Sequence, residues 1–256
     1  MHHAYLDEYT DLNSLIHRLD PRIKTIILFT FIIFIIMTKP GIFLSFACYA
    51  LILMVLILFS RIPFGFILKK SLVVIPFVLL ISISIPFIKN GRIIADYTLG
   101  NFKLRVTYEG LMSFFTILAK SYLSLLCMII LITTTKFSEL LKAFQALKLP
   151  RIITLILSFM YRYIFVLQDE LMKMQQAKES RSIGSSRWFH IKTLSNMIAV
   201  LFIRAYERAE SVYLAMCSRG FRGEMRTINR FEIKTKDLFF LFIIIALLLS
   251  VKITVG

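Results

Sequence analysis

The stretch from residue 40 to residue 60 contains 21 residues and no charged side chain. At a rise of about 1.5 Å per residue, a helix of this length crosses the roughly 30 Å hydrocarbon core of a bilayer. Two further stretches, 71–88 and 110–135, contain 18 and 26 residues, and only Lys120 interrupts the second. Because a chain inside a bilayer must satisfy its own backbone polar groups, these stretches predict membrane-spanning helices.

Two shorter uncharged stretches, 25–38 and 238–251, lie on either side of this group. Lys24, Lys39 and Lys252 stand at their ends, and a lysine can extend its long side chain toward the headgroups, so a short apolar stretch can still span. The hydrophobic content of 58% exceeds the roughly 45–50% of soluble domains. We therefore expect an all-α polytopic membrane protein with about five transmembrane helices.

Two of these stretches carry residues that are unusual inside a membrane helix. Pro76 and Pro86 each remove a backbone donor from 71–88, so we expect a bent or broken helix there. Lys120 lies inside 110–135. An embedded ammonium group faces a partner or water more often than lipid, but a lysine near the interface can also extend toward the headgroups. Both placements of Lys120 are open at this point.

The long segment 136–236 is strongly basic. It holds 18 of the 31 Lys and Arg and 8 of the 15 Asp and Glu, which gives +10 (18 minus 8) of the formal net charge of +16. Basic residues accumulate on the cytoplasmic side of membrane proteins, so we expect this segment, and with four spans before it the N-terminus, in the cytoplasm. The segment 89–109 counts against this orientation, because it would be external yet has four basic and two acidic residues.

Apolar residues recur at helical spacing within this basic segment. Residues 137–147 predict a short amphipathic helix that Pro150 ends. Residues 191–216 carry apolar side chains at every third or fourth position, which predicts a long amphipathic helix. The stretch 152–168 is apolar except for Arg162, so it is either a helix that enters the membrane or the buried start of a long helix.

We expect one continuous fold in three consecutive parts, since no repeat or Pro/Gly-rich linker divides the chain. Residues 1–135 form an N-terminal tail and the first four transmembrane helices. Residues 136–236 form a cytoplasmic arm of long amphipathic coupling helices, and residues 237–256 form the C-terminal transmembrane helix.

The chain lacks the motifs of nucleotide-binding and hydrolytic enzymes. None of its nine glycines is followed by Lys, so there is no Gly-x-x-x-x-Gly-Lys phosphate loop, and there is no Gly-x-Ser-x-Gly or His-Glu-x-x-His sequence. His2 and His3 beside Asp7 could bind a transition metal, but a tail with no such role explains them better. We predict no catalytic residue, no cofactor and no metal site, and three cysteines that serve as apolar packing residues.

Two similar tripeptides stand near the ends of the predicted long helices. Ser180-Arg181-Ser182 and Ser218-Arg219-Gly220 are each accompanied by a glycine, Gly184 or Gly220. An Arg in a last turn complements the helix dipole by about 0.3–1 kcal/mol and Gly caps the helix, so either tripeptide alone indicates only a helix end. Their repetition indicates a shared role.

A third motif begins the first span. Asp20 is suited to the helix N-cap, and Pro21 fits the first helical position because its missing N–H has no helical partner there. The motif consists of Asp20, Pro21, Arg22 and Lys24.

These motifs together resemble the transmembrane (T) component of energy-coupling factor (ECF) transporters, over nearly the whole chain. The stretches 204–224 and 147–151 are similar to the cobalt-type, CbiQ branch. The resemblance implies a subunit with no catalytic site in a prokaryotic plasma membrane. It also implies that the tripeptides around Arg181 and Arg219 dock into grooves of two cytoplasmic ABC-type ATPase subunits, while the membrane part holds a separate substrate-binding (S) subunit. The chain departs from the family pattern in having Ser, not Ala, before each Arg.

The leading hypothesis is therefore a T component that couples ATP hydrolysis to cobalt uptake, with nickel or a vitamin as the alternative cargo. A polytopic enzyme acting on lipids is a second alternative, which only the thin acidic pair Asp7 and Asp11 favours. A basic anchor for nucleic acid or anionic lipid is a third. Because Glu207, Glu210 and Glu224 interrupt the basic surface, we expect the lipid bilayer and protein subunits, not nucleic acid, as partners.

Overall fold

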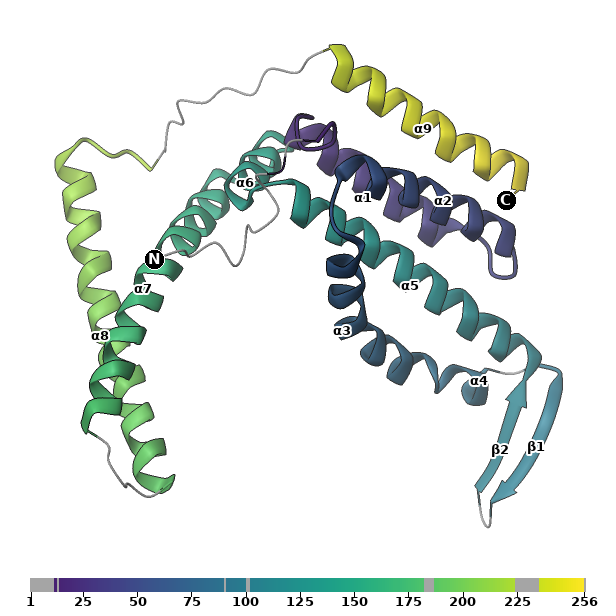
Figure 1. Cartoon of the computed structure of the whole chain (residues 1–256), viewed down its shortest axis with the longest axis horizontal. Helices are drawn as coiled ribbons and strands as arrows, with labels where there is room; N and C mark the ends of the chain where they lie inside the picture. The colour runs from purple at the N-terminus through teal and green to yellow at the C-terminus, as the bar shows by residue number, and fades with distance from the viewer. Residues whose placement is uncertain are drawn as a thin grey trace. The chain divides into compact units, whose positions relative to one another are not determined.

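The computed structural model describes residues 12, 14–89, 91–99, 102–181, 187–223 and 235–255. The chain forms two compact units: a membrane unit within residues 4–143 and 231–256, and an arm within residues 144–230. Figure 1 labels the elements, which are α1 (Pro21–Met37), α2 (Phe43–Ser60), α3 (Phe64–Ser82), α4 (Ile85–Ile88), β1 (Ile93–Leu99), β2 (Phe102–Thr107), α5 (Tyr108–Thr134), α6 (Phe137–Ala146), α7 (Arg151–Arg181), α8 (Arg187–Ser218) and α9 (Thr235–Val255).

The expected all-α polytopic membrane fold is confirmed. Among the described residues, five helical segments are long and apolar enough to cross a membrane: α2, α3 with α4, α5, α7 and α9. Four of them coincide with predicted spans, and the fifth, α7, contains the ambiguous stretch 152–168. The first predicted span forms α1, whose 17 residues stand at the short end of the roughly 17–25 that a spanning helix needs.

The core of the membrane unit lies between α1, α2, α5 and α9. Phe31, Leu53 and Leu248 are wholly buried in it. The ring of Phe31 meets Tyr49 edge to face, with 5.8 Å between centroids. Because α5 contacts α1, α2, α3 and α4, it is the central helix of this unit (Figure 1).

Lys120 has the first of the two placements considered above, because its ammonium group faces a partner within the protein. Its Nζ donates to the main-chain carbonyl of Ile36 at 2.7 Å and to that of Thr38 at 2.6 Å. The last carbonyls of a helix have no intrahelical donor, so the ammonium group supplies one at the C-terminus of α1. A membrane-embedded charge thus joins α5 to α1.

The expected break in the third span is present. Pro76 lies inside α3, which ends at Ser82, and Pro86 lies in the short helix α4. Beyond it, Thr107 Oγ1 donates to the Lys89 carbonyl at 2.7 Å and accepts from the Gly110 amide at 3.2 Å. These bonds join the end of α4 to the start of α5.

A β-hairpin in 89–109 was not predicted. β1 and β2 pair antiparallel, with Asp96 opposite Arg105 and Leu99 opposite Phe102. The charges of this segment predict only an external loop. The Gly100-Asn101 dipeptide lies between runs rich in β-branched and aromatic residues, which is a sequence signal for a hairpin. That signal was not used in the prediction.

Candidate functional site

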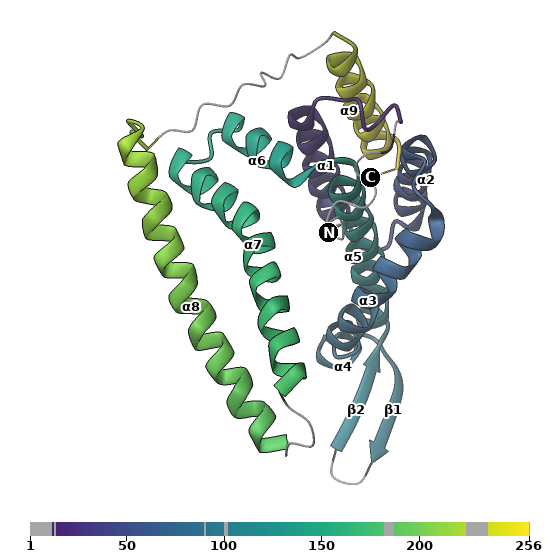
Figure 2. The same cartoon turned by 60° about the vertical axis from the view of Figure 1, so that its left-hand side comes forward.

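The arm is built from the two longest helices, which run antiparallel. α7 and α8 contain 31 and 32 residues, and both figures show them side by side with opposite chain directions (Figure 2). Arg181 ends α7 and Arg219 follows the end of α8. The two arginines therefore lie at opposite ends of the arm, separated by about 48 Å, the length of a 32-residue helix.

Polar side chains join α7 to α8 near the middle of the arm. Glu170 of α7 and Arg204 of α8 form an ion pair. A shallow groove of about 280 Å³ passes the pair, with Val166, Leu167 and Ser211 on its walls. An exposed pair of this kind contributes about 0–1 kcal/mol, so the length and packing of the helices determine the shape of the arm more than this contact does.

The end of α7 presents Arg181 to solvent. The Ser180 hydroxyl donates to the carbonyl of Gln176 at 2.9 Å and so folds back on its own helix, while Arg181 is exposed. Ser182, the third member of this tripeptide, and the nearby Gly184 lie outside the described residues.

The end of α8 holds Arg219 in a defined cap. The amide of Phe221 donates to the Met216 carbonyl at 3.1 Å and that of Gly220 to the Cys217 carbonyl at 2.9 Å, which together form a Schellman motif. Gly220 has φ +77°, a conformation that favours glycine, and a Cβ there would meet nothing within 4 Å. The glycine thus fixes Arg219 as the C-cap residue, and Ser218 donates back to Leu214 at 2.9 Å.

The arm exposes much apolar surface. On α7 only Thr154 is buried among the described residues, while Ile156 and Ile164 are more than 45% exposed. On α8, Trp188 is 81% and Phe202 73% exposed. α7 runs without a break from Arg151 to Arg181, so 152–168 is the first part of a long helix, and apart from Thr154 its side chains are not buried within the arm. This helix is also long and apolar enough to enter a membrane. Apolar surface on this scale is typical of interfaces with a protein or a membrane.

The N-terminal motif lies in the membrane unit. Asp20 Oδ1 accepts from the Arg22 amide at 2.9 Å and Pro21 is the first residue of α1, as predicted. Lys24 is 3% exposed, and its Nζ donates to the carbonyl of Thr134 at 2.9 Å. This motif and the two arginine tripeptides therefore belong to different units.

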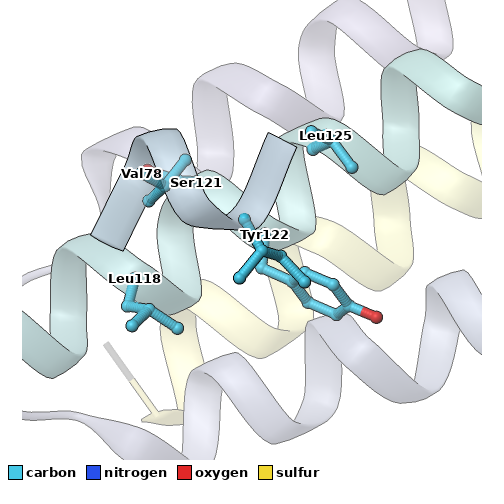
Figure 3. Close-up of a pocket in the computed structure, with 6 residues that line it drawn as sticks. Val78, Leu118, Ser121, Tyr122 and Leu125 are labelled. Atoms are coloured by element: carbon cyan, nitrogen blue, oxygen red, sulfur yellow. The ribbon is translucent and has the colours of Figure 1, made fainter. Parts of the chain in front are cut away.

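The membrane unit also contains a pocket that sequence reasoning missed. It has a volume of about 300 Å³ and lies between α3 and α5, with Val78, Leu118 and Leu125 among its apolar walls and Ser121 and Tyr122 as its polar groups (Figure 3). Ile75, the neighbour of Pro76, also lines the pocket, and that proline was the available signal. In the part of the chain that the structure describes, no three His, Cys, Asp or Glu side chains gather where they could hold a metal ion. The tail residues His2, His3, Asp7 and Asp11 lie outside that part.

Comparison with known proteins gives matches to one family of transport proteins over most of the chain. The model of the CbiQ family, described as "Cobalt transport protein", matches residues 12–229, which include both tripeptides and the N-terminal motif. An uncharacterized protein of Methanocaldococcus jannaschii is 30% identical over 244 residues, covering 93% of this chain and 82% of its own length. Proteins named energy-coupling factor transporter transmembrane protein EcfT are 31% identical in Listeria innocua (87% of this chain, 86% of that protein) and 30% identical in Bacillus subtilis (88% of each).

Proposed function

The chain belongs to the T-component family of ECF transporters, and from this premise we propose that it is the non-catalytic coupling subunit of an ATP-driven importer. The observation that carries the proposal is the placement of Arg181 and Arg219 at the two ends of one helical arm. Each guanidinium offers a planar fork of donors that fits a carboxylate in a groove of an ATPase subunit. The subunit transmits movement and performs no chemistry.

The length of the arm determines how many ATPase subunits it can meet. Arg181 and Arg219 are separated by about 48 Å, the length of a 32-residue helix. This distance is too large for both side chains to enter one groove. They suit two ATPase subunits, one at each end. The Schellman cap holds the backbone at Arg219, so a displacement of the ATPase moves α8 as a whole.

The membrane unit holds the substrate-binding S subunit, and the exposed apolar surface of α7 and α8 adds to this contact. Trp188, Ile198 and Phe202 are each more than half exposed. A membrane-embedded partner is apolar on its outer surface, so burying these side chains against it is favourable. The acidic residues Glu207 and Glu210 on the same helix disfavour a nucleic-acid surface.

The proposal places the arm and the N-terminus in the cytoplasm of a prokaryote and the membrane unit in its plasma membrane. α1, α2, α3 with α4, and α5 cross before the arm, and α9 crosses after it. The excess of basic residues in 136–236 supports this orientation. The β-hairpin is then on the external side.

Cobalt is the proposed cargo. The description of the matching family, "Cobalt transport protein", supports it, as does the likeness of 204–224 to the cobalt-type branch. The ion would be bound by the S subunit. Uptake of radiolabelled cobalt(II) by cells that express the complete complex, with nickel(II) and vitamins as competitors, tests the assignment; competition by a vitamin would overturn it.

The coupling role is tested by reversing both charges together. In cells that co-express the neighbouring subunits, Arg181→Glu with Arg219→Glu should abolish uptake and the co-purification of the ATPases. Arg208→Glu is the matched control, because Arg208 is an exposed arginine within α8, away from its ends. Normal ATPase retention by the double variant would refute the proposal.

A further inference from the structure

One lysine is buried where several elements of the membrane unit meet. Lys24, in the first turn of α1, is 3% exposed. Its Nζ donates to the Thr134 carbonyl at 2.9 Å and to the His17 carbonyl at 3.1 Å. Thr134 is the last residue of α5, and His17 belongs to the turn before α1. A single side chain thus joins three parts of the chain.

Three carboxylates from three elements act on this ammonium group through their charge. Glu139 comes from α6, Asp20 caps α1 and Asp237 lies in the first turn of α9, and all three interact electrostatically with Lys24. Asp20 and Asp237 are each only 6% exposed. Burying a charge is costly unless hydrogen bonds and opposite charge offset it, so the two carbonyls and these carboxylates together stabilise Lys24 in this position.

Both connections between the membrane unit and the arm begin at this place. The chain leaves the membrane unit after residue 143, in the last turn of α6, and returns at residue 231, four residues before α9. Only two residues, Thr135 and Lys136, separate α5 from α6, and Leu141 then packs into the interior. The carbonyl that Lys24 binds is therefore next to the turn that sets the direction of α6.

We infer that Lys24 is a positioning residue that fastens α6 and the start of α9 to the end of α5, so that arm displacement reaches the membrane helices. The inference rests on the proposed function, because bound ATPases produce that displacement. Without the ammonium group, the carbonyls of Thr134 and His17 lose this donor and the three carboxylates lose a nearby positive charge. α6 and the first turn of α9 would then move without carrying α5 with them.

Lys120 provides a matched control. Its Nζ also donates to two main-chain carbonyls at a helix end, those of Ile36 and Thr38, and it also joins α1 to α5. It does so at the C-terminal end of α1, where neither connection to the arm begins. Lys24→Met and Lys120→Met therefore remove the same chemistry at opposite ends of one helix.

Hydrogen exchange of the full-length chain in nanodiscs tests the fastening without any partner. Lys24→Met should speed amide exchange about tenfold in 135–143 and 235–240 and leave 36–42 unchanged. Lys120→Met should instead speed exchange in 36–42 and leave 135–143 and 235–240 unchanged. Glu139→Gln, a change at a partly buried side chain, should give a smaller increase, about threefold, in 135–143. The Glu139→Gln variant still tests the inference if Lys24→Met does not fold. Unchanged protection of 135–143 in both Lys24→Met and Glu139→Gln would overturn the inference.

Exchange in the complex with the ATPases tests the transmission. On addition of ATP, the wild type and Lys120→Met should change protection in both the arm and 135–143, whereas Lys24→Met should change it in the arm alone. An ATP response in 135–143 that survives Lys24→Met would overturn the inference. A wild-type chain that binds no ATPase would instead refute the proposed function, and the partner-free comparison would still decide whether Lys24 fastens α6.

Discussion

Gly110 provides a prediction whose magnitude follows from three distances. A Cβ at this position would lie 2.6 Å from Thr107 Oγ1, 2.7 Å from Pro86 Cα and 3.0 Å from the Pro86 carbonyl oxygen. Two of these atoms belong to the backbone of α4 and cannot rotate away. Overpacking of this kind costs about 1–3 kcal/mol, and weakening the Thr107 cap costs about 1 kcal/mol more.

The gain in helix propensity offsets part of this cost. Replacing Gly with Ala inside a helix favours the helix by about 1 kcal/mol, which leaves a net destabilisation of about 2 kcal/mol for Gly110→Ala. For a chain of this size, that corresponds to a fall in Tm of about 4–8 °C. A thermal unfolding scan of the purified full-length protein in detergent measures it.

Gly65→Ala is the matched control. Gly65 also lies in the first turn of a membrane helix, α3, but a Cβ there would meet nothing within 4 Å. Its Tm should stay the same or rise slightly, because only the helix propensity changes. If Gly110→Ala matched Gly65→Ala to within the error of the scan, the argument that α4 and α5 require a glycine at their contact would be wrong.

Three further substitutions test the packing of each unit. Phe31→Ala removes a wholly buried ring and should cost about 3–5 kcal/mol, seen as loss of a monodisperse peak in detergent; a Tm near that of the wild type would contradict the described core. Thr107→Ala removes the cap of α5 and should cost about 1–2 kcal/mol, whereas Thr107→Ser should retain most of the stability; equal losses would exclude the hydroxyl as the cause. Glu170→Gln should change stability by less than about 1 kcal/mol, because its pair with Arg204 is partly exposed, and a larger fall in Tm would show that the pair determines the arm.

The membrane-spanning helices were predictable because their signal is local. Uncharged runs identified α2, α5 and α9, and Asp20 with Pro21 marked the start of α1 within the sequence itself. The break between α3 and α4 followed from the prolines for the same reason. These features depend on the length and composition of one segment, not on what it contacts.

Contacts between distant segments were not predictable. Lys120 was correctly considered unusual, but its partners are carbonyls 84 and 82 residues away, and nothing local indicates them. The tripeptides were recognised by their repetition, yet only the antiparallel direction of α7 and α8 places Arg181 and Arg219 at opposite ends. The hairpin was missed because the prediction for 89–109 used only the charged residues. It did not use the turn-forming dipeptide Gly100-Asn101.

The central claim is that the arm binds one ATPase at each end through its own arginine. Native mass spectrometry of the complex counts the ATPase subunits that each variant retains. Breaking a charge-assisted contact costs about 2–5 kcal/mol, and sites this far apart act independently, so each interaction should weaken at least about thirtyfold without affecting the other. The account predicts two ATPases on the wild type and on Arg208→Glu, one on Arg181→Glu, one on Arg219→Glu and none on the double variant. Loss of both ATPases from either single variant, or retention of both by the double variant, would contradict it.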